Sequence, residues 1–147
     1  MDLELKQVEQ RLPMLFEKNR LASFKSWKFN DRSKCSAKKL AEAGFYYAGT
    51  PDEPDGVQCF LCNKALDGWE KEDNPWDEHI SHSKNCEFAK LRLPEAKLTT
   101  DRFLQFCLEM VLVQSKNYVT KVVESNKKEF SQKYTAKKKT LNGIRKK

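Results

Sequence analysis

Three cysteines and one histidine stand at spacings that suit a metal ion. Cys59 and Cys62 are separated by two residues. His79 follows after sixteen more, and Cys86 after another six. Three thiolates and one imidazole form a complete tetrahedral ligand set for structural zinc. Because the protein fills all four positions, no position is left for a catalytic water. The spacing therefore predicts one Zn²⁺ ion with a structural role.

The alternative is that these are unrelated core residues, and the specificity of the spacing argues against it. His82, one turn beyond His79, is a possible competing ligand. The first ten residues lack the apolar run of a signal peptide, and no stretch is apolar enough to span a membrane. We therefore expect a cytosolic or nuclear protein, in which the five cysteines are poor disulfide candidates.

Charge is distributed unevenly along the 147 residues, whose net charge is +7. Residues 115–147 carry eleven basic and two acidic side chains. Residues 50–78 carry nine acidic side chains against two lysines. An acidic domain surface and a basic tail favour two different partners. The tail lysines suit non-specific contact with DNA or a nuclear-import signal, and a solvated tail is an equal alternative.

The elements that must position the ligands form an α+β fold with a small antiparallel sheet. Ser36 is a predicted N-cap and Gly44 a helix stop, which places a short helix at 36–45. Alternating apolar residues predict strands, and residues 75–91 read as one helix that carries His79 and Cys86 on one face. The predicted strands are 45–49, 57–62 and 65–69.

A long helix should follow, because no proline or glycine occurs from Thr99 to Leu141. Forty-three helical residues would span about 64 Å. Its apolar positions recur three, four or seven apart, which is typical of a helix-packing seam; the alternative is a partly frayed surface helix. The predicted organisation is a lead-in at 1–17, a zinc domain at 18–92, a connector at 93–98, the long basic α-helix at 99–141 and a frayed tail at 142–147.

These features resemble the baculovirus inhibitor-of-apoptosis repeat, or BIR, family. Arg20 and Phe24 match the family, as do the zinc ligands and their spacing. The same is true of two longer stretches, LAEAGFYY (40–47) and DGVQCFLCNKALDGWE (55–70). The chain is most similar to the short members with one BIR and a long basic C-terminal helix. The resemblance implies a zinc-stapled BIR domain without enzymatic activity.

The resemblance to short members also implies partners. Such proteins are subunits of the chromosomal passenger complex, which places an Aurora kinase on centromeres and the spindle midzone. Their long helix bundles with helices of the inner centromere protein and borealin, and a homodimer is a further possibility. The expected localisation is the nucleus, chromosomes, midbody and cytoplasm. The expected partner-helix or dimer interface comprises Leu12, Leu98, Phe103, Met110, Tyr118, Val122, Phe130 and Tyr134.

The resemblance to the short members also implies a peptide groove that binds a histone N-terminus carrying phosphothreonine. Trp69 is suited to pack against a small first side chain, while Asp67 and Asp73 accept hydrogen bonds from the free amine. Lys64 and His82 match the family positions that face the phosphate. The remaining predicted groove residues are Glu53, Leu66 and Glu72. Taken alone, Lys64 and His82 are more often surface residues and Trp69 is more often a core residue, and the resemblance favours the groove instead.

A second function of a different class is binding and inhibition of caspases, or binding of their antagonists, as in larger BIR proteins. That activity usually needs a flanking linker or a second repeat, and the lead-in shows no evident inhibitory strand. A ubiquitin-ligase activity is disfavoured because the chain has neither a RING ligand set nor a catalytic cysteine setting. We expect a non-enzymatic scaffold, with caspase binding as the alternative.

Overall fold

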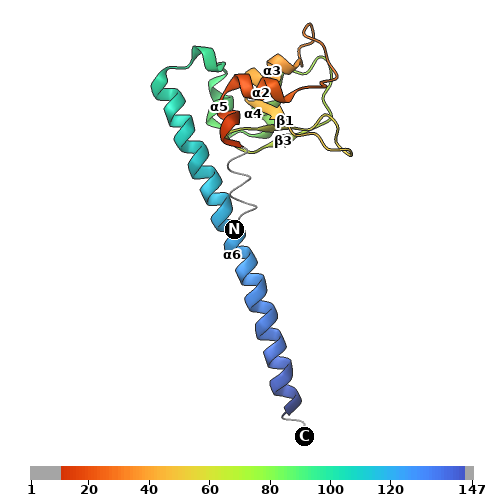
Figure 1. The fold of residues 1–147 in the computed structure, drawn as a ribbon, viewed down its shortest axis with the longest axis vertical. Coiled ribbons are helices and arrows are strands. Elements are labelled where there is room, and N and C mark those ends of the chain that lie inside the picture. The colour runs from red at the N-terminus through yellow and green to blue at the C-terminus, as the bar shows by residue number, and fades with distance from the viewer. Residues whose placement is uncertain (1–10, 145–147) are drawn as a thin grey trace. The chain divides into compact units, whose positions relative to one another are not determined.

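The structure, a computed structural model, describes residues 11–144, with side chains described through residue 138. Predictions for residues 1–10 and 145–147 lie outside this range. The chain divides into two units between Val113 and Gln114. In chain order the elements are η1 (Leu12–Leu15), α2 (Glu17–Ser23), α3 (Ala37–Glu42), β1 (Phe45–Tyr47), β2 (Val57–Cys59), β3 (Ala65–Leu66), α4 (Pro75–His82), α5 (Glu87–Leu91), η2 (Glu95–Lys97) and α6 (Thr100–Ile144) (Figure 1).

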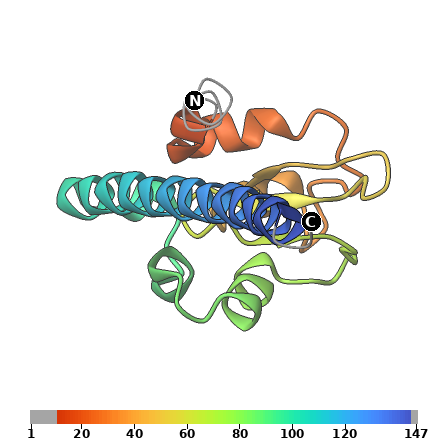
Figure 2. The ribbon, with the colours of Figure 1, turned by 90° about the horizontal axis from the view of Figure 1, so that it is seen from below.

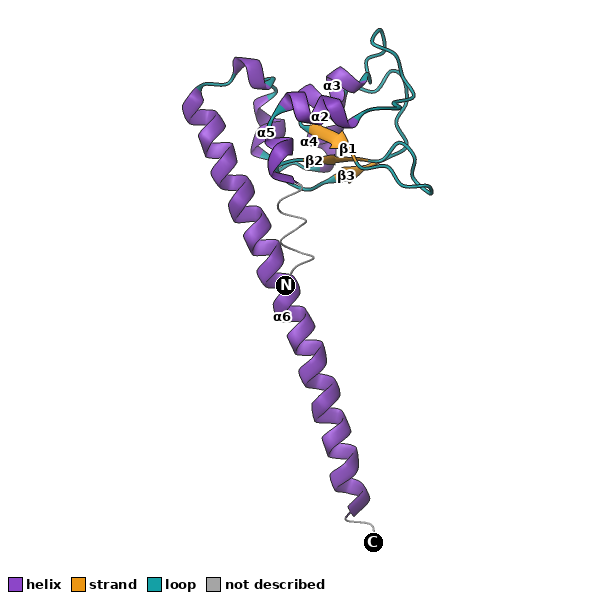
Figure 3. Cartoon of the chain, viewed as in Figure 1, coloured by secondary structure: helices purple, strands orange, loops and turns teal. Residues whose placement is uncertain are grey.

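The three strands form one antiparallel sheet, as predicted, and their order in it is β1–β2–β3 (Figure 3). Phe45 pairs with Cys59, and Val57 pairs with both Tyr47 and Leu66. The strands are shorter than the sequence suggests. Those expected at 57–62 and 65–69 end at Cys59 and Leu66, because the chain turns sharply at the metal-binding knuckle and again after β3.

The short helix α3 forms as its sequence predicts. The Ser36 hydroxyl caps it by accepting a hydrogen bond from the amide of Lys39 at 3.4 Å. Gly44 follows the helix with φ +92°, a conformation that favours glycine. A Cβ atom at Gly44 would lie 2.9 Å from the ring of Phe88. Gly44 therefore ends the helix and lets the core aromatic residues approach the backbone.

Arg20 is fully buried and ties the lead-in to the domain. Its guanidinium donates hydrogen bonds of 2.8–2.9 Å to the carbonyls of Met14, Leu15 and Ala41. It also lies 4.6 Å from the centre of the Phe60 ring. Burial lowers the pKa of Arg20 to about 10, so the group stays charged at neutral pH. These bonds satisfy two of its three nitrogens, and the third, Nη2, lies 3.7 Å from the Glu95 carboxylate, which lowers the cost of burying the charge.

Aromatic side chains fill the core beside the sheet. Phe88 is 1% exposed, and its ring centre lies 5.0 Å from that of Phe60 and 5.5 Å from that of Phe106. Phe106 and Met110 belong to the first turns of α6 and are almost completely buried. The start of the long helix is therefore part of the domain core. Cys35 is also fully buried there, without a role in the predicted metal site.

Helix α6 continues to Ile144, three residues beyond the expected end of the long helix. In the part that belongs to the second unit, no described side chain from residue 115 to residue 138 is buried. The large exposed apolar residues of this stretch are Val119, Val123, Phe130 and Tyr134. Among the described helices, α6 included, none has the run of apolar residues that crossing a bilayer requires.

Candidate functional site

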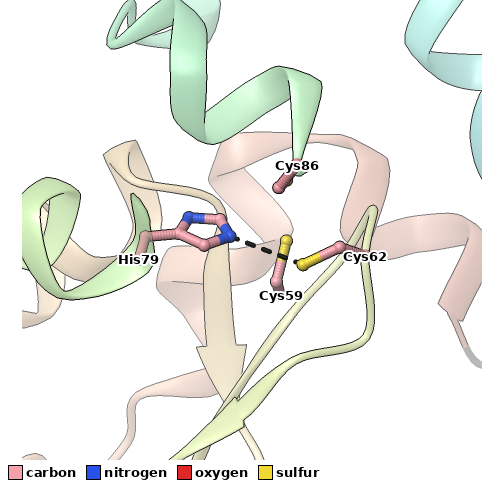
Figure 4. A group of neighbouring side chains, drawn as sticks. All are labelled: Cys59, Cys62, His79 and Cys86. Carbon is pink, nitrogen blue, oxygen red and sulfur yellow. Dashed lines mark hydrogen bonds between the residues drawn. The ribbon is translucent and has the colours of Figure 1, made fainter. Parts of the chain in front are cut away.

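The four predicted ligands come together in space, as Figure 4 shows. Cys59 ends β2 and Cys62 lies in the turn that follows. His79 lies on α4, and Cys86 immediately precedes α5. Their ligand atoms all lie within 4.8 Å of one another. The prediction of one four-ligand metal group is therefore confirmed, although these residues are separated by up to 27 positions in the sequence.

The expected single helix over 75–91 is wrong. The structure has two helices, α4 and α5, separated by residues 83–86 (Figure 2). In one continuous helix, residues seven apart are about 10 Å apart along the axis, too far for two ligands of one ion. The break at Ser83, Lys84 and Asn85 instead brings Cys86 back toward His79. Serine and asparagine favour such helix ends, because their side chains compete for backbone hydrogen bonds.

The ligand set fits zinc, and its surroundings orient it. His79 donates its Nδ1 proton to the carbonyl of Ala43 at 2.8 Å, which leaves Nε2 facing the sulfurs. His79 Nε2 lies 3.6 Å from Cys62 Sγ. The amide of Leu61 donates to Cys59 Sγ at 3.4 Å, and the Ser83 hydroxyl donates to Cys62 Sγ at 3.3 Å. Such outer hydrogen bonds fix the ligands and are typical of structural zinc sites.

The electrostatics of the group favour a bound cation. Hydrogen bonds from Cys59 and Cys86 hold the pKa of Cys62 far below that of a free thiol. Burial raises the pKa of Cys59 well above that of a free thiol. Burial opposes a charge on His79, but the neighbouring Cys62 and Cys86 sulfurs outweigh it and raise its pKa to about 9. A divalent cation would stabilise the thiolates that this buried cluster must hold.

A groove of about 230 Å³ is formed in part by α4, the helix that also carries the ligand His79. β3, the loop after it and α4 provide its walls. Three carboxylates, one indole and one imidazole face it, and no lysine or arginine lines it among the described residues. The groove therefore suits a positively charged group beside a small apolar one. Its lining residues are Leu66, Asp67, Gly68, Trp69, Asp73, Glu78 and His82.

Asp55 stabilises the loop after β3, which forms one wall of the groove. Its carboxylate accepts hydrogen bonds from the amides of Gly68 at 3.2 Å and Trp69 at 2.8 Å. It also pairs with Lys28 at 2.7 Å, and its side chain is only 13% exposed. Burial would raise the pKa of Asp55, but these bonds outweigh it and lower it. Gly68, with φ +73°, allows the sharp turn that presents both amides.

The structure brings together five of the eight predicted groove residues. Trp69 is 4% exposed and packs on Phe45, so it belongs mainly to the core and contributes only part of its surface to the groove. Asp73 uses one carboxylate oxygen to accept the amide of Glu70 at 2.7 Å. The other three of the five are Leu66, Asp67 and His82.

The remaining three predicted residues do not line this groove. Glu53 is exposed in the turn after β1. Lys64 is half-buried in the knuckle, and Glu72 pairs with Lys34 at 3.2 Å. Gly68 and Glu78 line the groove but were not among the residues predicted from the sequence. The spacing of Glu78 and His82, four residues apart on a helix, was the signal that could have revealed Glu78.

The predicted interface residues fall into different environments. Met110 is fully buried in the domain's own core, so it offers no surface to a partner. The expectation that Met110 belongs to a partner interface is therefore wrong. Leu98 packs against the core, and Phe103 lies beside Phe16 with tilted rings whose centres are 5.6 Å apart. The others are exposed or half-exposed: Leu12, Tyr118, Val122, Phe130 and Tyr134.

Comparisons with known proteins agree with this architecture. Residues 20–90 match the family described as "BIR: Inhibitor of Apoptosis domain". Baculoviral IAP repeat-containing protein 5 of Mus musculus is 40% identical over 119 residues, covering 80% of this chain and 82% of the relative. The Cavia porcellus protein of the same name is 38% identical, covering 81% of each.

The likeness extends to amphibian proteins. Baculoviral IAP repeat-containing protein 5.2 of Xenopus tropicalis is 37% identical over 106 residues, covering 72% of this chain and 68% of the relative. The similarity thus extends beyond the 71 residues of the BIR match and into the long helix region. With its single BIR, its four zinc ligands and its long C-terminal helix, the chain belongs to the baculoviral IAP repeat-containing protein 5, or survivin, family of inhibitor-of-apoptosis proteins.

Proposed function

We propose that this protein is a non-enzymatic subunit of the chromosomal passenger complex. Its BIR groove reads the N-terminus of a histone tail that carries phosphothreonine. Its long helix bundles with helices of the inner centromere protein and borealin, and the complex carries an Aurora kinase to centromeres and the spindle midzone. The protein would act in the nucleus and on mitotic chromosomes, and at the midbody in cytokinesis. Family membership is the basis of this proposal.

The acidic groove is the observation that carries the peptide-reading part. Asp67 and Asp73 face the same hollow as Trp69. Carboxylates accept charge-assisted hydrogen bonds from an ammonium group, and an aromatic wall suits a small first side chain. His82 stands at the edge of the groove with its side chain 52% exposed, where it is accessible to a phosphate. Lys64 is the second proposed phosphate contact on the basis of the family resemblance alone, because it does not line this groove.

A peptide titration tests this function. Zinc-loaded full-length protein is titrated calorimetrically with a histone N-terminal peptide, with its N-acetylated form and with the phosphothreonine form. We expect acetylation to abolish binding and the phosphate to strengthen it. Asp67→Asn should weaken binding of the free-amine peptide by about tenfold, since a charged hydrogen bond is lost. Equal affinity for the free and acetylated peptides would contradict the proposal.

The exposed apolar residues of α6 support the scaffold part. Val119, Val123, Phe130 and Tyr134 are spaced four, seven and four residues apart, so they share one helix face. Phe130 is 72% exposed and its ring stacks with that of Tyr134 at 6.5 Å. Co-expression with helices of the inner centromere protein and borealin is the test, and failure to recover either helix would count against the bundle.

A second candidate function is caspase binding, which is favoured by the description of the matched family as an inhibitor-of-apoptosis domain. A pull-down with zinc-loaded protein distinguishes the two functions. Recovery of passenger-complex proteins supports the scaffold, while recovery of caspases or their antagonists alone supports the alternative.

A further inference from the structure

Two neighbouring groove residues, Glu78 and His82, lie within ion-pair distance of each other, a contact that is ionic when the imidazole is protonated and that the proposed function does not use. Glu78 and His82 lie one turn apart on α4, and both line the groove. Glu78 Oε2 lies 3.5 Å from His82 Nε2. Their side chains are 38% and 52% exposed, so the pair is accessible from solvent. The one imidazole proposed to meet a phosphate therefore already has an anionic partner.

The other charged groups around the groove do not offset this anion. Asp67 and Asp73 come from the loop after β3, and both are acidic. Among the described residues no lysine or arginine lines the groove. A phosphate carries a charge of about −1.5 to −2 at neutral pH. A phosphate at His82 must therefore displace the Glu78 carboxylate or bind beside it, and like charges at such distances repel.

We infer that Glu78 is a specificity-determining residue of this groove, one that limits the preference for a phosphorylated peptide. Its carboxylate holds His82 as an internal counter-charge and competes with phosphate for that imidazole. The inference rests on the proposed peptide-reading function. Because the pair is solvent-exposed, the competition is moderate in size, so Glu78 sets the degree of discrimination and does not abolish phosphate binding.

The same helix offers a matched control. Asp77 is adjacent to Glu78, but its carboxylate pairs with Arg92 at 2.7 Å and it is not among the groove's lining residues. Asp77→Asn and Glu78→Gln remove the same charge from the same helical turn. Any effect of net charge or of the helix dipole should appear in both variants. Only Glu78→Gln should free His82.

The experiment measures calorimetric Kd values for the phosphothreonine and unmodified forms of one free-amine peptide. It uses zinc-loaded full-length protein, and zinc content and Tm verify the fold of each variant. We expect Glu78→Gln to tighten phosphopeptide binding by about two- to fivefold, in line with the loss of one solvent-exposed charge pair. The Kd of the unmodified peptide should change less than twofold. Asp77→Asn should leave both values within twofold.

His82→Ala and the double variant Glu78→Gln/His82→Ala show whether the effect acts through the imidazole. The gain from Glu78→Gln should disappear when His82 is absent. The inference is overturned if Glu78→Gln leaves the phosphopeptide Kd unchanged, if Asp77→Asn gives the same gain, or if the gain survives without His82. It is also overturned if the unmodified peptide weakens instead, since Glu78 would then hold the amine.

The N-acetylated peptide distinguishes a failure of the proposed peptide-reading function from a failure of the proposed role of Glu78. If the unmutated protein binds free and acetylated peptides equally, the proposed peptide-reading function fails, and the role of Glu78 fails with it. If binding requires the free amine and Glu78→Gln has no effect, only the role of Glu78 is overturned.

Discussion

The zinc-bearing unit buries many of its apolar side chains, whereas the later part of α6 leaves its apolar side chains exposed. In residues 11–113, aromatic rings such as Phe88 pack into a core beside a four-ligand metal group. From residue 115 to residue 138 no described side chain is buried, and Phe130 is 72% exposed. Apolar surface left in water is a marker of interaction sites. The first region is stabilised by its own contacts, whereas the second region leaves an apolar face exposed.

Charge separates the same two regions. Residues 50–78, which include most of the groove, are strongly acidic, and residues 115–147 are strongly basic. Opposite charges favour different partners and raise their association rates. The comparison therefore predicts that damage to the first region affects folding, while damage to the second affects assembly.

Zinc removal should have the largest effect, and only on the first region. Chelation should abolish the cooperative unfolding transition, because structural zinc contributes on the order of 10–16 kcal/mol in small zinc-binding peptides. Metal analysis and near-ultraviolet circular dichroism measure this. An equally stable fold after chelation would contradict the structural role of zinc in the first region.

The affinity for zinc should also depend on pH. Zinc binds thiolates and neutral imidazole, whereas free thiols, and His79 with its pKa of about 9 in the folded cluster, hold protons at neutral pH, so binding releases protons. Raising the pH toward these pKa values lowers the cost of losing the protons and should tighten binding by up to about tenfold per pH unit for each proton released. Competition with a chromogenic chelator near pH 6 and pH 8 tests the sign; a pH-independent affinity would contradict the assigned ligand state.

Phe88→Ala should be the most damaging of the single substitutions considered. Phe88 is 1% exposed and contacts Phe60, Trp76 and Phe106. Truncating such a ring should lower the free energy of unfolding by about 3–5 kcal/mol. Urea denaturation of the zinc-loaded protein measures it. Leu108→Ala, at a position 61% exposed in the same unit, is the control and should change stability little. Similar losses in both variants would contradict the assigned core.

Asp55→Ala should have an intermediate effect, which should appear in both stability and peptide binding. It removes the acceptor of two backbone amides and the partner of Lys28. We expect a loss of about 1–3 kcal/mol in unfolding free energy, together with weaker peptide binding. Asp52→Ala, at an exposed position in the same turn, is the matched control. Unchanged amide chemical shifts of Gly68 and Trp69 in the Asp55 variant would refute the stabilising role.

Phe130→Ala should have the smallest effect on stability. Because this side chain is largely exposed, the free energy of unfolding should change by no more than about 0.5 kcal/mol. Affinity for partner helices should nevertheless fall by about tenfold or more, as is typical of aromatic residues at interface hot spots. Gln132→Ala, two residues away and also exposed, is the control. A large loss of stability would show that this face is covered within the chain itself.

Residue types and local spacing determined much of the molecule. The spacing of Cys59, Cys62, His79 and Cys86 identified the ligand set, because zinc accepts few combinations of ligands. Ser36 and Gly44 marked the ends of α3, because caps and stops act within a few residues. The absence of proline and glycine from Thr99 to Leu141 predicted the long helix. Each of these features depends on chemistry confined to neighbouring residues.

Only the tertiary structure decided what depends on distant contacts. The break between α4 and α5 places Cys86 at the metal group, whereas sequence periodicity favoured one helix. Met110 and much of Trp69 belong to the core, and Asp55 reaches two amides that follow it by 13 and 14 positions. A sequence pattern gives the face of an element but not the element that covers it. Burial and pairing are set by three-dimensional packing, which brings residues together regardless of their separation along the chain.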